Sequence, residues 1–229
     1  MIVPDRGRLS VIVPFYNEAY NVAPLYHELI LVSGLGDLIF EIIMIDDGSS
    51  DQTLQEIKSL AEADNRIIVI SIGTNKGQSY ATMQGIQKAS GELIAILDGD
   101  QQNDPRDLPQ MIRRLYAGYD LVCGWRKERM DKKLSVLLSR IANLIIRIIF
   151  SVNIHDSGCS AKVGYSTHFK QIRFFEHFHR YIPIILAKEK LRVTEIVVNH
   201  RPRTSGQSKY KLSKAFLVIK ELLFLRFHY

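Results

Sequence analysis

The sequence has few cysteines, no long apolar run and no leader-like beginning. Cys123 and Cys159 are the only cysteines in 229 residues and lack Cys-x-x-Cys spacing, which disfavours a disulfide scaffold or structural zinc site and favours a reducing compartment. Residues 1–10 carry charges and lead directly into an apolar run, so we expect no signal peptide and no export. No uninterrupted apolar stretch reaches about 18 residues, so we predict no clear membrane-spanning helix.

The composition is that of a globular protein with a basic surface. The length suits one domain, or one domain with an appendage, and allows a substantial core. A hydrophobic content of 46% is ordinary, which leaves the formal net charge of +6 as the informative quantity. A basic surface attracts nucleic acid, anionic lipid head groups or phosphorylated substrates, and charge alone does not choose among them.

Two acidic motifs each follow a short apolar run. Residues 41–45 precede the motif DDGSSD at 46–51, and residues 92–97 precede DGDQQ at 98–102. Nearly continuous apolar runs are typical of buried parallel strands, and ligands bind beyond the carboxyl ends of such strands. Clustered carboxylates repel one another unless a cation compensates them, and Mg²⁺ and Mn²⁺ prefer oxygen ligands. The sequence therefore predicts a nucleotide-sized crevice that holds a hard metal ion bridging phosphate oxygens.

Strand-like and helix-like segments alternate through the first half of the chain. This order predicts an α/β fold with a doubly wound, mostly parallel sheet. The expected strands are 9–15, 41–45, 67–72, 92–97 and 120–124, and the expected helices include 22–30, 54–61, 80–86 and 108–117.

The second half of the chain has a different character. Residues 134–152 and 213–229 read as amphipathic helices with broad apolar faces interrupted by Arg and Lys. Such helices either lie in a membrane interface or form core helices with a solvated edge, and the pattern alone does not separate the two. We therefore expect a nucleotide-binding core at 1–130 and an acceptor-binding, membrane-interface part at 131–229.

Six motifs in this order resemble glycosyltransferase family 2, specifically its polyprenyl- or dolichyl-phosphate sugar synthases of the dolichol-phosphate mannosyltransferase type. The motifs are VPFYNE at 13–18, DDGSSD at 46–51, NKG at 75–77, DGDQQ at 98–102, DSGC at 156–159 and RTSGQSKY at 203–210. Each is weak alone, but the set covers nearly the whole chain. The resemblance implies a Rossmann-like GT-A fold, a nucleotide-sugar donor and Mg²⁺ or Mn²⁺.

The resemblance also implies a donor site and a metal site. Expected donor-binding residues are Pro14, Tyr16, Glu18, Asp46, Asp47, Asn75, Gly77, Asp98, Arg203, Ser208 and Lys209. Asp100 and Gln102 are the expected metal ligands. Since Asp98, Asp100 and Gln102 alternate along the sequence, we expect an extended segment that presents them on one side. For Asp51 a structural role as a helix N-cap competes with ligand binding.

A third implied set contacts the acceptor phosphate. It comprises Arg126, Ser139, Arg140 and Asn143, with Lys132 and Lys133 as alternatives to the residues of the helix. Together with Asp98 and Asp100, Arg126 completes the expected catalytic set, because a guanidinium binds phosphate as a fork. His177 and His179 lack a third matched ligand, so we interpret them as ordinary surface residues.

The function that the resemblance implies is inverting transfer of a sugar from a UDP- or GDP-linked donor to polyprenyl or dolichyl phosphate at the cytoplasmic membrane face. A phosphate acceptor needs little deprotonation, so positioning and stabilisation of the leaving diphosphate suffice. The alternatives are a family 2 enzyme acting on another glycan or lipid-linked acceptor, a processive synthase, disfavoured because Gln-x-x-Arg-Trp is lacking, and a non-enzymatic nucleotide-sugar sensor. No nucleic acid partner is expected, and oligomeric state, homo-oligomers included, stays open.

Overall fold

The computed structural model describes residues 7–32, 34–128, 133–202 and 221–227. Its strands are β1 (Leu9–Phe15), β2 (Ile39–Asp46), β3 (Ile67–Ser71), β4 (Leu93–Ile96), β5 (Leu121–Trp125), β6 (Lys162–Tyr165) and β7 (Val193–Val197). Its helices are α1 (Ala19–Leu31), α2 (Thr53–Ala63), α3 (Gln78–Lys88), η1 (Pro105–Asp107), α4 (Leu108–Tyr116), α5 (Lys133–Phe150), α6 (Ser166–Lys170) and α7 (Phe178–Lys188). Residues 221–227 are also helical.

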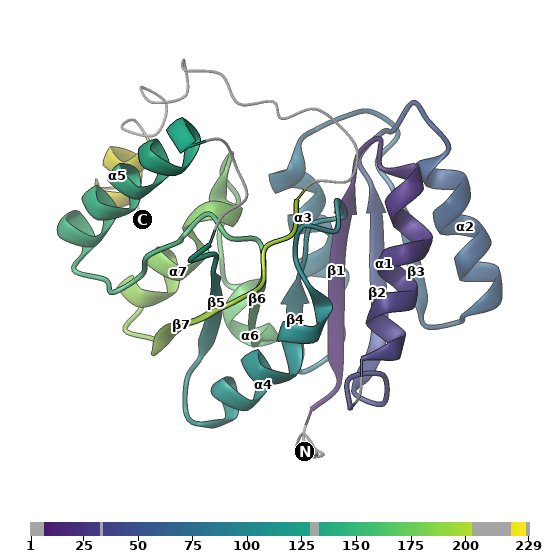
Figure 1. Ribbon diagram of the computed structural model, residues 1–229, viewed down its shortest axis with the longest axis horizontal. Coiled ribbons are helices and arrows are strands. Elements are labelled where there is room, and N and C mark those ends of the chain that lie inside the picture. Colours follow the sequence, from purple (N-terminus) through teal and green to yellow (C-terminus); the bar gives the residue numbers. More distant parts are fainter. Residues whose placement is uncertain (1–6, 33, 129–132, 203–220, 228–229) are drawn as a thin grey trace.

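The strands form one sheet in the order β3-β2-β1-β4-β6-β5-β7 (Figure 1). All pairs are parallel except those of β6, which runs antiparallel to both β4 and β5. The carboxyl ends of six strands and the amino end of β6 therefore share one edge. This arrangement confirms the predicted α/β class and its mostly parallel, GT-A type sheet.

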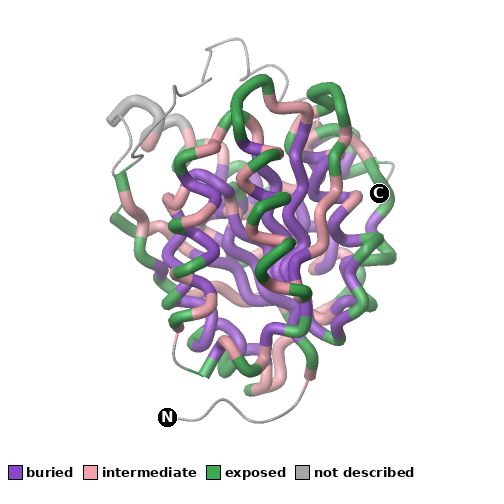
Figure 2. Tube along the Cα trace, turned by 90° about the vertical axis from the view of Figure 1, so that its right-hand side faces the viewer, coloured by how far each residue is buried: buried purple, intermediate pink, exposed green. Residues whose placement is uncertain are grey.

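Two apolar clusters cover the two faces of the sheet. Helices α1, α2 and α4 pack on one face through side chains such as Leu25, Ile57 and Met111. Helices α3, α6 and α7 pack on the other through side chains such as Ile86 and Phe178. Buried residues accordingly fill the centre of the molecule in Figure 2. A sheet covered on both faces explains the nearly continuous apolar runs of its inner strands.

The central strand β1 contains a proline near its end. Pro14 pairs with Ile45 of β2, whereas the β1–β4 pairing ends earlier, at Ile12 and Ile96. The missing N–H of Pro14 thus falls where the ladder with β4 has already stopped. The chain then leaves the sheet at Tyr16.

Helix α5 and the helix at 221–227 lie close together (Figure 1). Arg226 donates a hydrogen bond from Nη1 to the backbone carbonyl of Ile149, 3.3 Å away. In the part of the chain that the structure describes, none of the helices combines the length and the apolar character needed to cross a membrane.

Candidate active site

The predicted site residues gather at the carboxyl edge of the sheet. Tyr16 follows β1, Asp46 ends β2, Asp98 lies just beyond β4, and Arg126 follows β5 directly. Lys162 opens β6 at the same edge because that strand runs in the opposite direction. The topology therefore places Tyr16 of one strand beside acidic and basic groups from four others.

The loops after β1 and β2 hold each other in place. Asn17 accepts a hydrogen bond from the backbone N–H of Ser50 and donates its own backbone N–H to the Ser49 hydroxyl. Asp51 accepts from the backbone N–H groups of Thr53 and Ala19, at the amino ends of α2 and α1. Burial tends to raise the pKa of Asp51, but these hydrogen bonds lower it overall. Asp51 thus supports the starts of two helices, but the expectation that it is a helix N-cap is wrong, because the N-cap of α2 is Gln52.

Asp47 positions the loop that contains Asn75 and Gly77. Asp47 is only 3% exposed. Its two carboxylate oxygens accept hydrogen bonds from the backbone N–H groups of Lys76 and Gly77, each at 2.8 Å. Gly48 follows with φ of 72°, and a Cβ there would lie 2.5 Å from the carbonyl carbon of Thr74. The close approach therefore requires glycine, and the two loops form one unit.

Asp47→Asn should weaken binding of a nucleoside diphosphate about tenfold, because an amide nitrogen would face a backbone N–H where a charged acceptor now stands. Calorimetry with UDP and GDP measures this affinity. Asp37→Asn is the matched control, since Asp37 is exposed beside the amino end of β2, at the opposite edge of the sheet. Equal affinity of Asp47→Asn and the control for the nucleotide would contradict the assignment.

The segment after β4 is a turn, so the expectation of an extended strand presenting Asp98, Asp100 and Gln102 is wrong. Gln101 has a positive φ of 59°, and Oδ1 of Asp100 accepts the backbone N–H of Gln102 at 3.1 Å. This local hydrogen bond lets an aspartate turn the chain where strand pairing would need extended backbone. The three side chains still come from one short turn.

Two acidic side chains, Asp98 and Asp100, lie near two basic ones, Arg126 and Lys162, in this site. Burial and the charge of Asp100 raise the pKa of Asp98 to about 6, although a hydrogen bond from Ser160 and the charges of Arg126 and Lys162 oppose the rise. Asp100 and Lys162 are 6% and 2% exposed. The Lys162 ammonium donates to the backbone carbonyl of Cys159.

A divalent cation suits this donor set. Hard cations bind carboxylate and amide oxygens, and they relieve the repulsion that raises the pKa of Asp98. Among the described residues, no cluster of three or more His, Cys, Asp or Glu side chains is suited to enclose a metal ion. Mg²⁺ typically takes only one or two protein carboxylates and completes its coordination with phosphate and water. The residues therefore fit a metal shared with a diphosphate.

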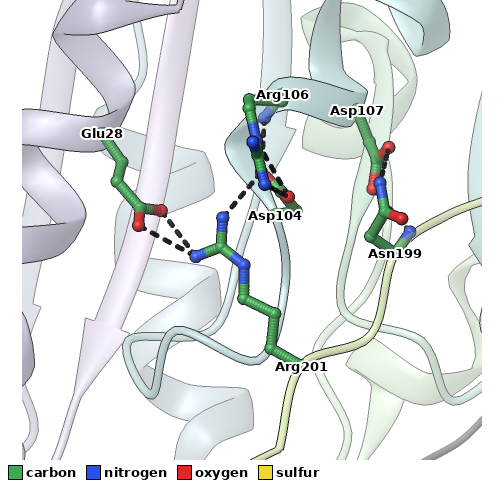
Figure 3. Close-up of polar contacts among 6 residues, drawn as sticks. All are labelled: Glu28, Asp104, Arg106, Asp107, Asn199 and Arg201. Carbon is green, nitrogen blue, oxygen red and sulfur yellow. Dashed lines mark hydrogen bonds and ion pairs between the residues drawn. The ribbon is translucent and has the colours of Figure 1, made fainter.

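The segment 199–201 is attached to α1 and to the segment 104–107, which follows the turn that contains the expected metal ligands (Figure 3). Arg201 forms ion pairs with Glu28 of α1 at 2.7 Å and with Asp104 at 2.9 Å. The backbone N–H of Arg201 also donates to the carbonyl of Gln102. Three elements are thereby joined next to the turn. The remaining predicted donor residues, Arg203, Ser208 and Lys209, lie outside the described residues, as does Lys132.

Arg126, which the resemblance assigns to the acceptor phosphate, forms a buried ion pair. Its Nε and Nη2 donate to the two carboxylate oxygens of Asp156 at 2.7 and 2.9 Å. Burial alone would lower the pKa of Arg126, but Asp156 raises it well above its usual value. The planar fork is thus fixed, and its Nη1 has no partner among the described residues.

Asn143 connects helix α5 to the same loop. Its side-chain oxygen accepts from the backbone N–H and the hydroxyl of Ser157, at 3.2 and 2.8 Å. Arg140, one turn earlier on α5, is exposed, and Ser139 is half-buried. The structure therefore brings Asn143 and Arg126 to one loop and leaves Arg140 facing solvent.

The interpretation of His177 and His179 as ordinary surface residues is wrong. Nδ1 of His179 lies 2.7 Å from the hydroxyl of Ser79 on α3, and the backbone N–H of His177 donates to that hydroxyl. The His177 ring contacts Glu221 at 2.6 Å. Both histidines therefore have structural contacts that join α3, α7 and the helix at 221–227.

The sequence does not predict the roles of several residues of the site. Asp156 and Cys159 belong to the motif DSGC at 156–159, which does not indicate the pairing of Asp156 with Arg126. Gln78, Ser160 and Lys162 stand next to motifs, and no spacing rule singles them out. Only the order of strands in the sheet brings them together.

Comparisons with known proteins place the chain in a family. Residues 10–177 match the family described as Glycosyl transferase family 2. A dodecaprenyl-phosphate galacturonate synthase of Rhizobium johnstonii is 38% identical over 224 residues, which cover 96% of this chain and 66% of that protein. An undecaprenyl-phosphate 4-deoxy-4-formamido-L-arabinose transferase of Yersinia pestis is 33% identical over 218 residues, covering 94% and 66%. The chain thus spans 66% of the length of both relatives.

A solved structure shows the same fold. Glucosyl-3-phosphoglycerate synthase from Mycobacterium tuberculosis, in complex with Mn²⁺, UDP-glucose and phosphoglyceric acid, superposes with a TM-score of 0.70 at 18% identity. The match covers 96% of this chain and 78% of that one.

Proposed function

The chain belongs to glycosyl transferase family 2, and from this premise we propose that it transfers a sugar from a nucleoside diphosphate to polyprenyl phosphate at a membrane surface. One observation carries the proposal. The loop at 156–160 binds Asn143 of α5, whose outer face is apolar, and also binds Asp98 beyond the end of β4. The helix proposed to face lipid and the acidic edge of the sheet are therefore joined by a few residues.

The donor is proposed to lie against the loops after β1 and β2. Tyr16, Glu18 and Asp46 are at the carboxyl edge, where nucleotides bind in doubly wound sheets. Oε2 of Glu18 accepts a hydrogen bond from the Asn21 amide at 2.5 Å, which holds its carboxylate in a defined orientation. The proposed donor site also includes Pro14, Asn75 and Gly77. Asp47 fixes the loop that contains Asn75 and Gly77.

Asp100 and Gln102 are proposed to hold Mg²⁺ or Mn²⁺. When bound, the ion neutralises charge on the diphosphate and so assists its departure. Both residues come from the turn beside Asp98, and the solved structure with the same fold contains Mn²⁺ and UDP-glucose.

The proposed reaction is a single displacement that inverts the anomeric carbon. An oxygen of polyprenyl phosphate forms the new bond to that carbon, while the bond to the nucleoside diphosphate breaks and its electrons leave with the diphosphate. The acceptor is already an anion, so no general base is needed. Arg126 is proposed to bind phosphate through Nη1, because Nε and Nη2 are engaged by Asp156.

The membrane contact is proposed to be an apolar patch on two neighbouring helices. The patch consists of Ile141, Leu144, Ile145, Ile148 and Ile149 on α5, with Leu223, Phe224 and Phe227 on the helix at 221–227, all exposed. Apolar patches of this kind on basic amphipathic helices bind membrane interfaces. The same patch supports the division into a nucleotide-binding part, 1–130, and a membrane-interface part, 131–229.

Ile148→Glu combined with Phe227→Glu should abolish most binding to anionic liposomes, because these side chains are 71% and 74% exposed in the patch. Sedimentation with vesicles measures the bound fraction. Leu31→Glu is the matched control, since Leu31 is 78% exposed on α1, far along the chain from the patch. High salt should weaken binding of the unaltered protein without eliminating it, since apolar burial is not screened. Undiminished binding of the double variant would contradict the patch.

Arg140→Ala should raise the KM for polyprenyl phosphate by about one to two orders of magnitude while donor affinity stays unchanged, because one charge-assisted phosphate contact is lost. Transfer rates over a lipid-phosphate titration and donor calorimetry separate the two effects. Arg147→Ala removes the same charge two turns later on α5 and serves as control. Lost donor affinity with an unchanged lipid requirement would contradict the role of Arg140.

The direct test of donor use is incubation with polyprenyl phosphate in vesicles, Mg²⁺ or Mn²⁺ and a panel of UDP- and GDP-sugars. Mass spectrometry of the extracted lipid should show a sugar-phosphate-polyprenol product for at least one donor. If no donor gave such a product while the protein still bound the nucleotide, the result would favour a non-enzymatic nucleotide-sugar sensor or an enzyme with another acceptor.

A further inference from the structure

Both oxygens of the Asp98 carboxylate are held by hydrogen-bond donors from other elements. Oδ1 accepts from Nε2 of Gln78, the first residue of α3, at 2.5 Å. Oδ2 accepts from the hydroxyl of Ser160, in the loop before β6. The Asp98 side chain, just beyond β4, thus has its orientation set by two distant parts of the chain.

Ser160 sits in a loop that is itself anchored. Asp156 is fixed by Arg126, Ser157 hydrogen-bonds to Asn143, and the carbonyl of Cys159 accepts from buried Lys162. These contacts surround the Ser160 backbone and limit where its hydroxyl can go.

Gln78 is anchored from both of its neighbours. The backbone N–H of Gly77 is bound to Asp47, and the hydroxyl of Ser79 contacts His179 and the backbone N–H of His177. Gln78 is exposed, but its backbone cannot shift without breaking these bonds. Its amide therefore reaches Asp98 from a fixed starting point.

An aspartate gains much from such support. The torsion that orients the carboxylate plane is intrinsically broad, so the side chain alone does not fix it. An ionised carboxylate has about four acceptor sites, and Gln78 and Ser160 occupy two of them. The remaining sites match the hydroxyl groups of a sugar, which are hydrogen-bond donors.

We propose that Gln78 and Ser160 are positioning residues that hold the Asp98 carboxylate ready to bind hydroxyls of the donor sugar. The inference rests on the proposed function and deepens it, because it assigns Asp98 to the sugar and not to the base or ribose. Fixing an acceptor before the substrate arrives avoids the cost of ordering it during the reaction.

The test compares Gln78→Met, Ser160→Ala and Ser160→Thr in the intact protein, with thermal unfolding to confirm folding. Gln78→Met and Ser160→Ala should each lower kcat/KM for the donor about 10- to 100-fold, because small misplacements of reacting groups have effects of that size. Ser160→Thr keeps the hydroxyl and should recover most of the activity. The affinity for UDP or GDP without sugar should stay unchanged in all three.

A second arm asks whether both residues act through Asp98. In an Asp98→Ala background, Ser160→Ala and Gln78→Met should cause no further loss of transfer, since the group that they position is absent. The inference would be overturned by a further loss of transfer in the Asp98→Ala background or by a loss of nucleotide affinity in the single variants. It would also be overturned if the parent protein were active and both single variants kept full activity. A parent protein that transfers no sugar from any donor would instead contradict the proposed function, and the inference would fall with it.

Discussion

Asp100→Ala is expected to reduce sugar transfer about a thousandfold or more, which makes it the most damaging single substitution for activity. A metal ion beside a diphosphate supplies several kcal/mol of charge stabilisation, and about 4 kcal/mol corresponds to a thousandfold in rate. Asp100 is 6% exposed, and its removal costs the turn one hydrogen bond to the Gln102 backbone, while the bond from the Arg201 N–H to the Gln102 carbonyl remains. The fold should therefore survive the change, and Mn²⁺ binding in the presence of UDP should be lost.

Three measurements accompany this prediction. Gln102→Ala should give a smaller loss, since a neutral amide contributes less to a divalent cation than a carboxylate does. Glu62→Ala, on the exposed surface of α2, controls for the loss of a negative charge. Wild-type turnover by Asp100→Ala in the presence of a chelator would show that the metal assignment is wrong.

Asp156→Ala is expected to lower the free energy of unfolding by about 3–5 kcal/mol, because it leaves a buried guanidinium without its partner. The side chains of Arg126 and Asp156 are only 14% and 5% exposed, and two parallel hydrogen bonds join them. Such a loss is a large part of the stability of a typical domain. Urea unfolding followed by circular dichroism measures it, and Asp156→Asn provides a milder variant.

Arg192→Ala is the matched control for this ion pair. Its guanidinium is 69% exposed and lies 4.0 Å from Asp120, and exposed pairs contribute about 0–1 kcal/mol. The double variant that removes both Arg126 and Asp156 should lose less stability than the sum of the two single variants, since no charge is left unpaired. A loss for Asp156→Ala as small as that for Arg192→Ala would contradict the buried pair.

The first half of the fold could be predicted because its strands have a clear signal. Strands β1, β2 and β4 are buried on both faces and read as apolar runs, and α1 shows helical spacing in Val22, Leu25 and Leu29. Strands β6 and β7 were not predicted. Strand β6 has four residues, including Lys162 and Gly164, and β7 is largely half-buried, so neither shows the apolar run of an inner strand.

The sequence predicts that the motif residues share one edge of the sheet, but it does not predict their side-chain partners. Motifs identified Asp98, Asp100 and Arg126, and the sheet does bring these residues to one edge. Their contacts with Ser160 and Asp156 depend on β6 lying between β4 and β5, an order that no local pattern encodes. Similarly, the turn at 98–102 arises from a hydrogen bond between Asp100 and the Gln102 backbone, which alternation of polar residues does not reveal.

The chemical identity of the acceptor is the central claim, and a competition between acceptors tests it most directly. The purified protein receives one productive nucleotide sugar with polyprenyl phosphate, with polyprenol lacking the phosphate, or with water-soluble 3-phosphoglycerate. We expect a glycosylated product with polyprenyl phosphate alone, because Arg126 and Arg140 are proposed to bind a phosphate and the exposed apolar patch on α5 is proposed to bind a lipid. Transfer to 3-phosphoglycerate or to polyprenol at the same rate would contradict it.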